Sequence, residues 1–577
     1  MRGERRRRIA SADGTVAGAS IRSAVLTAEG LSAPAAEALI PPRPRAVPAV
    51  SGPQRRPWSR PGPAGPRRSA WRDPVVWTVA ALAFGAYFVI SLFRLLQLTP
   101  GSYDFGIYTE YVKQLSQLHA PVDDVMGPGF NLLGNHFQVA VGLLAPFFRL
   151  FPSPVTLLFF QALFAAVSVF PVVTAGFAVA GRNAGRLIGF AYAFSWGLQQ
   201  MIDFDFHEVA LAVPLLAFSV SALVRRRPLA AIAWALPLVF VKEDQGFTVA
   251  AIGVVLGATM AFRPAIPALP WGSSRTALRG GLFLVVWGLF WSMFAIAVII
   301  PHFNPLHQYF FWQDGGAVGG GQRFSVGGLI GQAATGWPTK VQTVVMLLLP
   351  TAFAALGSPV ALIALPSLVL RFMSTNTLFW GTGFHYSATV MPILFIAAAE
   401  SIGRCRIASS LGSSRAAPGG PAPVLACALV PALARVLVPV RDLVRLARTG
   451  LARHGPAMMA AIAVALAFQF PLSDLWHGAT YKLDAHVAAA NAAMAEVPAG
   501  ATVLTTLDLL APLAARTDTF WIGNPGNPLT QYIVFDGVDS GYYPNISNVP
   551  KFIATYFPHD GYVPVFQRDD VYVYKRG

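Results

Sequence analysis

Four side chains that bind metals or move protons lie within six residues of one another, in the segment MIDFDFHEVA. Asp203, Asp205, His207 and Glu208 stand between two apolar stretches long enough to belong in a lipid bilayer. Carboxylates and imidazole are normal ligands of divalent cations, and Asp203 and His207 would share one face of a helix. The spacing predicts a divalent metal, or a phosphate-bearing ligand held through one. The plainer alternative is that Asp203 or Asp205 caps the helix expected from about residue 208.

A single carboxylate, Asp104, is a candidate general base. It closely follows the first long apolar segment, within SYDFGIYTEYV, and precedes an amphipathic stretch at residues 107–118 that could lie on the membrane. A carboxylate in this position could take a proton from the hydroxyl of an acceptor. The alternative is again a cap, for a helix that starts at residue 105 or 106.

Two further polar clusters lie at the ends of apolar segments. VKEDQG contains Lys242, Glu243 and Asp244, and GTGFHYS contains His385 and Tyr386. Ionisable residues at membrane depth usually mark a pathway or a reaction site, so these five residues are candidates for substrate binding. Lys242 could offer positive charge to a lipid phosphate, or could form a salt bridge with its own neighbours.

The composition indicates a helical membrane protein. Of the 577 residues, 54% are hydrophobic and 12% are charged, whereas soluble domains carry roughly 25% charged residues. The mean hydropathy is +0.53. A closed β-barrel would need alternating segments of ~10 residues, which are absent from the sequence. The candidate membrane-spanning segments are 75–97, 155–180, 187–201, 208–224, 229–241, 246–262, 281–301, 341–357, 359–371, 386–402 and 456–471.

The distribution of charge predicts which side of the membrane each connection occupies. Two more apolar stretches, 136–151 and 424–440, contain prolines and are doubtful spans. If neither crosses, the arginine-rich connections all fall in the cytoplasm and the acidic segments fall on the other side, as the positive-inside rule requires. This arrangement has about 11 crossings. It gathers Asp104, the 203–208 segment, Lys242 and His385 on the extracytoplasmic side.

The two ends of the chain differ in character. Residues 1–72 contain 14 Arg and four acidic residues and are rich in Pro, Ala and Gly, which predicts a disordered cytoplasmic tail that binds anionic lipids rather than nucleic acid. The expected membrane domain covers 73–402, followed by a basic cytoplasmic segment (403–455) and a last spanning helix (456–471). Residues 472–577 read as a small extracytoplasmic α/β domain. Its predicted elements are strands at 501–506 and 531–537, helices at 507–516 and 549–557, and a closing hairpin.

Several motifs together resemble a known family. YDFGIYTEYVKQL, NLLGNHFQVAVGLLAPFFRLF, FDFHEVALAVPLLAF, VKEDQGF and FHYSATVMPILF are similar to the bacterial membrane proteins grouped as domain of unknown function 2079 (DUF2079), over about residues 75–402. The architecture of that family resembles the GT-C glycosyltransferases, polytopic enzymes that use sugars carried on polyprenyl phosphate. The resemblance implies an acidic catalytic residue at Asp104, acting as general base, a surface helix at 136–151, metal-binding residues at 203–208 and a substrate contact at His136. The paired Asp-Glu of some GT-C members is Asp-Phe here.

The leading hypothesis is therefore a membrane glycosyltransferase. It would move a sugar from a polyprenyl-phosphate donor to an extracytoplasmic acceptor, with membrane lipids as surroundings and a divalent metal ion as a candidate cofactor. A transporter or lipid-handling protein is the first alternative, although transporters usually carry ionisable groups near the bilayer midplane and in repeated halves. A non-catalytic envelope scaffold is the second.

Overall fold

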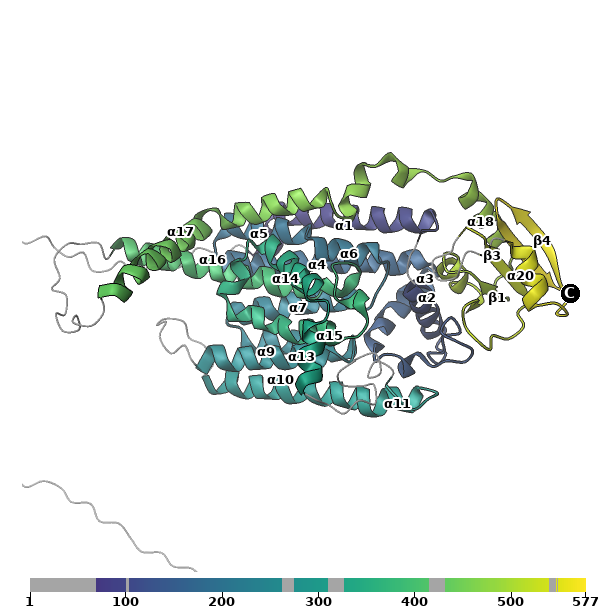
Figure 1. Ribbon diagram of the computed structural model, residues 1–577, viewed down its shortest axis with the longest axis horizontal. Coiled ribbons are helices and arrows are strands. Elements are labelled where there is room, and N and C mark those ends of the chain that lie inside the picture. The colour runs from purple at the N-terminus through teal and green to yellow at the C-terminus, as the bar shows by residue number, and fades with distance from the viewer. Residues whose placement is uncertain are drawn as a thin grey trace, which may run out of the picture. The chain divides into compact units, whose positions relative to one another are not determined.

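The computed structural model describes residues 69–99, 103–261, 274–309, 326–414, 431–538, 546 and 548–577 (Figure 1). Nearly all of the predicted cytoplasmic tail, and part of the predicted basic segment at 403–455, lie outside the described residues.

Long apolar helices form the main body of the described chain. The longest are α1 (Pro74–Leu96), α4 (Pro154–Val179), α10 (Ser274–Phe294), α16 (Val390–Ser414) and α17 (Pro431–Ala467). The first of them shows how local sequence sets a helix start. The Asp73 carboxylate accepts a hydrogen bond from the Val75 amide, and Pro74 occupies the first turn, where its missing N–H has no consequence.

Within the part of the chain that the structure describes, five segments are long and apolar enough to cross a membrane. They are Pro74–Leu96, Pro154–Val179, Arg275–Phe303, His385–Ala408 and Leu446–Ala467. The predicted class, a helical membrane protein, is confirmed. The number of crossings and the side on which each connection lies stay predictions.

Some expected spans are broken or merged. The segment predicted at 187–201 is divided between α5 (Arg182–Ala193) and α6 (Trp196–Asp203). Conversely, α17 runs without a break through the predicted boundary at residues 455 and 456. Hydropathy measures apolar content and contains no signal for a chain break, so neither feature could be placed from it.

The segment at 136–151 is not one continuous α-helix. It contains the 3-10 helix η3 (Val139–Leu144) followed by α3 (Ala145–Leu150). At about 1.5–2 Å per residue, such a segment falls well short of the ~30 Å hydrocarbon core. Its length agrees with the expectation that it does not cross.

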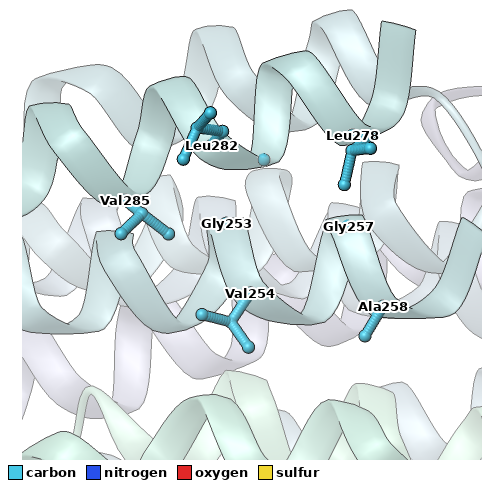
Figure 2. A pocket seen from close by; sticks show the side chains of 8 residues that line it. Gly253, Val254, Gly257, Ala258, Leu278, Leu282 and Val285 are labelled. Atoms are coloured by element: carbon cyan, nitrogen blue, oxygen red, sulfur yellow. The ribbon is translucent and has the colours of Figure 1, made fainter. Parts of the chain in front are cut away.

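Glycines bring two neighbouring helices into close contact. α9 (Gln245–Ala261) and α10 run side by side (Figure 1). A Cβ atom at Gly253 would lie 2.5 Å from the Gly281 carbonyl oxygen, and one at Gly288 would lie 2.2 Å from the Gly246 carbonyl oxygen. Larger side chains would force these helices apart. Figure 2 shows the apolar groove that remains beside this contact, between Val254 and Leu282.

The C-terminal part contains a five-stranded sheet with the order β2-β1-β3-β5-β4. β1 (Thr502–Thr505) is parallel to β2 (Asp518–Trp521) and β3 (Tyr532–Asp536), whereas β5 (Val571–Arg576) is antiparallel to β3 and to β4 (Tyr562–Arg568). Its helices are α18 (Ala485–Ala495), α19 (Leu510–Ala514) and α20 (Val549–Tyr556). The predicted small C-terminal sheet is confirmed, and the short β2 adds a strand that the sequence patterns did not predict.

The helix that carries Asp104 contacts both the helical body and the C-terminal part of the chain. This helix, α2 (Tyr103–Ser116), contacts α3 and α4 of the helical body and α19 of the C-terminal part. The remaining elements are η1 (Ala70–Arg72), η2 (Leu132–Gly134), α7 (Val209–Val224), α8 (Pro228–Ala235), η4 (Leu236–Phe240), the π-helical η5 (Ala295–Ile299), α11 (Ile300–Phe303), α13 (Val326–Ala334), α14 (Trp337–Leu348), η6 (Leu349–Thr351), η7 (Ala354–Gly357), η8 (Pro359–Ala364), α15 (Leu365–Met373), η9 (Thr377–Phe379), η10 (His385–Ser387), η11 (Pro471–Trp476) and η12 (Gly478–Tyr481).

Candidate functional site

A buried carboxylate, Glu208, is the centre of the largest polar network near Asp104. Glu208 stands at the start of α7 and its side chain is fully buried. One carboxylate oxygen lies 2.9 Å from the Lys242 ammonium, and the other contacts the Tyr108 hydroxyl and Nδ1 of His207. A buried carboxylate is stable only when charge and hydrogen bonds compensate its lost hydration. Here three separate segments supply that compensation.

His207 connects this buried network to Asp104. Its Nε2 lies 3.6 Å from an Asp104 carboxylate oxygen, while its Nδ1 contacts Glu208. The His207 side chain is 5% exposed, and that of Asp104 is 37% exposed. An imidazole with a carboxylate at each ring nitrogen can donate to both only when both nitrogens carry protons. Asp104 is therefore an accessible carboxylate that lies next to a buried imidazole, His207.

The charges of the neighbouring groups keep this network polarised. Burial alone would lower the pKa of the Lys242 ammonium, but the nearby carboxylates of Glu208, Asp244 and Glu243 together outweigh burial and hold that pKa above its usual range. Burial, together with Glu208, raises the pKa of Tyr108 well above its usual range. Lys242 therefore keeps its positive charge. The Tyr108 hydroxyl stays protonated and donates a hydrogen bond to the Glu208 carboxylate.

His385 contributes a second imidazole to the same place. The rings of His207 and His385 stack with centroids 3.5 Å apart. Nδ1 of His385 is buried and has no hydrogen-bond partner among the described residues. Beside it, the Tyr386 ring centroid lies 5.6 Å from the guanidinium carbon of Arg371. Arg371 donates hydrogen bonds to Ser387 Oγ and to two backbone carbonyls. The predicted pair His385 and Tyr386 thus joins the Glu208 network from η10.

The four predicted metal ligands do not gather around one point. Asp203 lies 3.0 Å from the Arg94 guanidinium, and Asp205 lies 4.0 Å from it. His207 and Glu208 instead contact each other. Within the described ranges, no group of three or more His, Cys, Asp or Glu side chains is arranged to hold a metal ion. This arrangement does not fit one ion bound by all four, and the metal stays a prediction that our proposed mechanism does not use.

The backbone is constrained at the turn between the first two predicted ligands, Asp203 and Asp205, and the last two, His207 and Glu208. Asp205 has φ of +70°, in the left-handed region that non-glycine residues rarely adopt. Gln161 holds this turn, because its side-chain amide donates to the Asp205 carbonyl at 2.8 Å and its side-chain oxygen accepts from the His207 amide at 3.1 Å. The turn sends Asp205 and His207 to different partners. The helical i,i+4 arrangement considered for Asp203 and His207 does not occur, because α6 ends at Asp203.

The predicted substrate-binding residues Glu243 and His136 form a separate buried cluster. The Glu243 carboxylate accepts hydrogen bonds from His136 Nδ1 at 2.7 Å, from the Phe137 amide at 3.1 Å and from the Tyr309 hydroxyl at 2.9 Å. Burial alone would raise the pKa of Glu243, but His136 and Lys242 together outweigh burial and lower that pKa to about 2. Asp244 contacts the Gln245 amide next to it in the chain. Only Lys242 of this trio touches Glu208.

Three contributors to the site were not identified from the sequence. Tyr108 lies four residues after Asp104 and so on the same face of α2, a spacing that could have revealed it. Arg371 is the one charge in the apolar run LPSLVLRFM, and isolated charges in such runs are usually functional. Gln138, whose side-chain amide lies 3.0 Å from the Tyr108 hydroxyl, carries no comparable signal.

Comparisons with known proteins give one family and several similar structures. A family model described as "Predicted membrane protein (DUF2079)" matches residues 94–415. No curated protein matches the sequence. Similar solved structures include ArnT from Cupriavidus metallidurans, bound to undecaprenyl phosphate and in the apo state. Both have a TM-score of 0.48, 14% identity and coverage of 86% of this chain and 97% of theirs. An oligosaccharyltransferase of Archaeoglobus fulgidus, in complex with Zn and sulfate, has a TM-score of 0.32, 12% identity and coverage of 86% and 73%.

Proposed function

This chain belongs to the DUF2079 family of predicted membrane proteins, and we propose that it transfers a sugar from a polyprenyl-phosphate donor to an acceptor hydroxyl, with Asp104 as general base. The observation that carries the proposal is the contact between Asp104 and His207. One accessible carboxylate lies 3.6 Å from a buried imidazole, which in turn contacts a buried carboxylate paired with an ammonium.

The proposed reaction is a displacement at the anomeric carbon of the donor sugar. The acceptor oxygen forms a bond to that carbon as its proton passes to Asp104, and the bond from the carbon to the phosphate oxygen breaks, so that the polyprenyl phosphate leaves with the electron pair. The His207 imidazole orients the Asp104 carboxylate, and the proton that Asp104 receives lies between the Asp104 carboxylate and the His207 ring. General-base assistance of this kind typically accelerates a reaction by about 10²–10⁴-fold.

The cationic side of the network is suited to the donor. We propose that Lys242, whose side chain is 16% exposed, faces the leaving phosphate while Glu208 fixes its position. His385 and Tyr386 would contact the donor beside it, since the buried Nδ1 of His385 still has hydrogen-bonding capacity. The extracytoplasmic location of the site is part of this proposal and rests on the distribution of charge along the sequence.

The test is a transfer assay with purified full-length protein in lipid nanodiscs and radiolabelled polyprenyl-phosphate sugars. Asp104→Asn keeps the shape of the side chain and removes its basicity, so we expect transfer to fall by about 10²–10⁴-fold. Asp569→Asn is the matched control, because Asp569 is exposed in the β4–β5 turn with φ of +46°, which asparagine also tolerates. Equal transfer by wild type and Asp104→Asn would remove Asp104 from the mechanism. The absence of transfer by the wild type with every donor, together with ion or lipid flux in liposomes, would favour the transporter.

A further inference from the structure

The helix that carries Asp104 has a second face, turned away from the Glu208 network. At roughly 100° per residue, Asp104 and Tyr108 lie on one side of α2, and Gly106, Glu110 and Lys113 lie on the opposite side. The first side contacts His207 and Glu208. The second side contacts the C-terminal part of the chain through Gly106 and Lys113.

Apolar packing joins α2 to α19. Leu510 and Ala511 belong to the same hydrophobic core as Phe105 and Val112, whereas the rest of the C-terminal sheet has two hydrophobic cores of its own. A Cβ atom on Gly106 would lie 2.9 Å from the Cβ of Leu510. The two segments are therefore packed as closely as a glycine permits, and α19 is part of the membrane domain's core as well as of the C-terminal domain.

Lys113 is the polar link across this contact. Its side chain is 6% exposed, and its ammonium lies 2.6 Å from the Thr517 carbonyl oxygen and 2.7 Å from the Glu110 carboxylate. A carboxylate oxygen of Asp518, at the start of β2, lies 3.8 Å away. A buried ammonium is strongly unfavourable without such partners. Glu110 belongs to α2 itself, whereas Thr517 and Asp518 come from the C-terminal domain, so docking of that domain supplies two of the three polar partners of Lys113.

A second polar contact supports the same joint. The Asn524 side-chain amide, just after β2, donates to the Val125 carbonyl at 2.6 Å, and the Tyr103 hydroxyl at the start of α2 donates to the same carbonyl at 2.5 Å. The Tyr103 ring also packs on Trp521, with ring centroids 4.7 Å apart. The beginning and the middle of α2 are thus both held by residues of the C-terminal domain.

We infer that Lys113 is a positioning residue, through which the C-terminal domain sets the rotation and depth of α2 and so places Asp104 against His207. The role of Asp104 in this inference rests on the proposed function, but the mechanical coupling does not. The C-terminal domain is accordingly a part of the site's scaffold, although none of its side chains contacts Asp104, His207 or Glu208 among the contacts described.

The test measures the placement of position 104 without relying on catalysis. In the full-length chain with Cys405 and Cys427 replaced by Ala, Asp104→Cys and His207→Cys are joined by a short bifunctional thiosulfonate, and the crosslinked peptide is quantified by mass spectrometry. Lys113→Met removes the ammonium and keeps an apolar stem. We expect the crosslink yield to fall at least about fivefold, since one tenfold change corresponds to only 1.4 kcal/mol of docking energy.

Two variants accompany this measurement. Lys551→Met, on the exposed face of α20, is the matched control and should leave the yield unchanged. Leu510→Ala loosens the packing on Gly106 while it keeps every charge, and it should lower the crosslink yield by a smaller factor than Lys113→Met. It replaces Lys113→Met in the test if that variant does not fold.

The outcomes separate this inference from the proposed function. An unchanged crosslink yield in folded Lys113→Met, or in Leu510→Ala when Lys113→Met cannot be obtained, would overturn the inference. A reduced yield supports it even if the wild type transfers no sugar, in which case only the proposed function fails. Where transfer is measured with native Asp104 and His207, Lys113→Met should lower kcat more than it raises the donor KM, and Lys113→Arg should restore part of the loss. An unchanged kcat would also contradict the inference.

Discussion

Two buried glutamates of this protein, Glu208 and Glu243, have opposite surroundings although each is fully enclosed. Glu243 accepts hydrogen bonds from three donors, His136, Phe137 and Tyr309, which come from distant segments of the chain. Glu208 is bound to Lys242, Tyr108 and His207, and through His207 it reaches the accessible Asp104. We therefore propose that the Glu243 cluster is a structural latch and that the Glu208 network is the site. Burial and charge do not distinguish the two glutamates. They differ because only the Glu208 network is linked, through His207, to the accessible Asp104 carboxylate.

The largest expected effect comes from removing the cation of the Glu208 network. Lys242→Met leaves Glu208 buried without the ammonium that contacts it, which should destabilise the protein by about 3–5 kcal/mol and abolish transfer. The double variant Lys242→Met/Glu208→Gln removes both charges, so it should regain most of the stability and none of the transfer. Denaturant unfolding in detergent and the transfer assay measure the two properties. Wild-type transfer by the double variant would show that this network is structural.

The Glu243 latch should affect stability in a pH-dependent way. Its pKa in the folded state, about 2, lies below the usual value near 4.5, so the folded state favours the charged form. The resulting stabilisation is present above about pH 4.5 and is lost as the pH falls toward 2. Glu243→Gln should therefore be about 3 kcal/mol less stable than wild type at pH 7, with a difference that narrows below pH 4.5. A difference that is constant from pH 7 to 3 would contradict this account.

Removing one donor from the latch should have a smaller effect. Tyr309→Phe deletes the hydroxyl that donates to Glu243 at 2.9 Å. Hydrogen bonds to charged groups contribute about 1.5–3 kcal/mol, so thermal unfolding should show a loss of about 2 kcal/mol while transfer stays close to the wild-type rate. Transfer reduced as strongly as in Asp104→Asn would place Tyr309 in the site and remove the distinction between the two glutamates.

The contact of α2 with the C-terminal domain should respond weakly to pH. Burial raises the pKa of Glu110 to about 7, and Lys113 offsets only part of that rise. Docked Glu110 holds a proton that an exposed glutamate releases, so docking should weaken about tenfold between pH 6 and pH 8. Asp123 is also buried with a raised pKa and acts in the same direction, while Lys113, Asp124 and Asp518 are the other charged groups facing the contact.

Hydrogen exchange of residues 103–116 measures this docking, after correction for the intrinsic pH dependence of exchange. Glu110→Gln keeps the side-chain shape and should remove most of the pH response. An exchange profile that is independent of pH in the wild type, or an equal response in Glu110→Gln, would contradict the assignment to Glu110.

The sequence predicted that several polar clusters lie near one another, but not the contacts within and between them. The apolar segments, the small C-terminal sheet and the polar residues around Asp104, Glu208 and Lys242 follow from composition and periodicity, which are local properties. The partner of each charge depends on contacts between distant segments: His136 lies 107 residues from Glu243, and Lys113 lies 404 residues from Thr517. The left-handed turn at Asp205 separates two pairs of ligands that spacing alone had placed together. The division of VKEDQG between a site residue and a latch could not be foreseen either.

The distinction between the two glutamates is tested most directly by one side-by-side assay. Transfer is measured for Asp104→Asn and Glu243→Gln at equal concentrations of folded protein and at pH 7. We predict that Asp104→Asn loses about 10²–10⁴-fold in rate with an unchanged unfolding midpoint. Glu243→Gln should unfold more easily and stay within about threefold of the wild-type rate, since none of its described contacts reaches the reacting groups. The reverse order of rates, or an equal loss in both variants, would contradict the account.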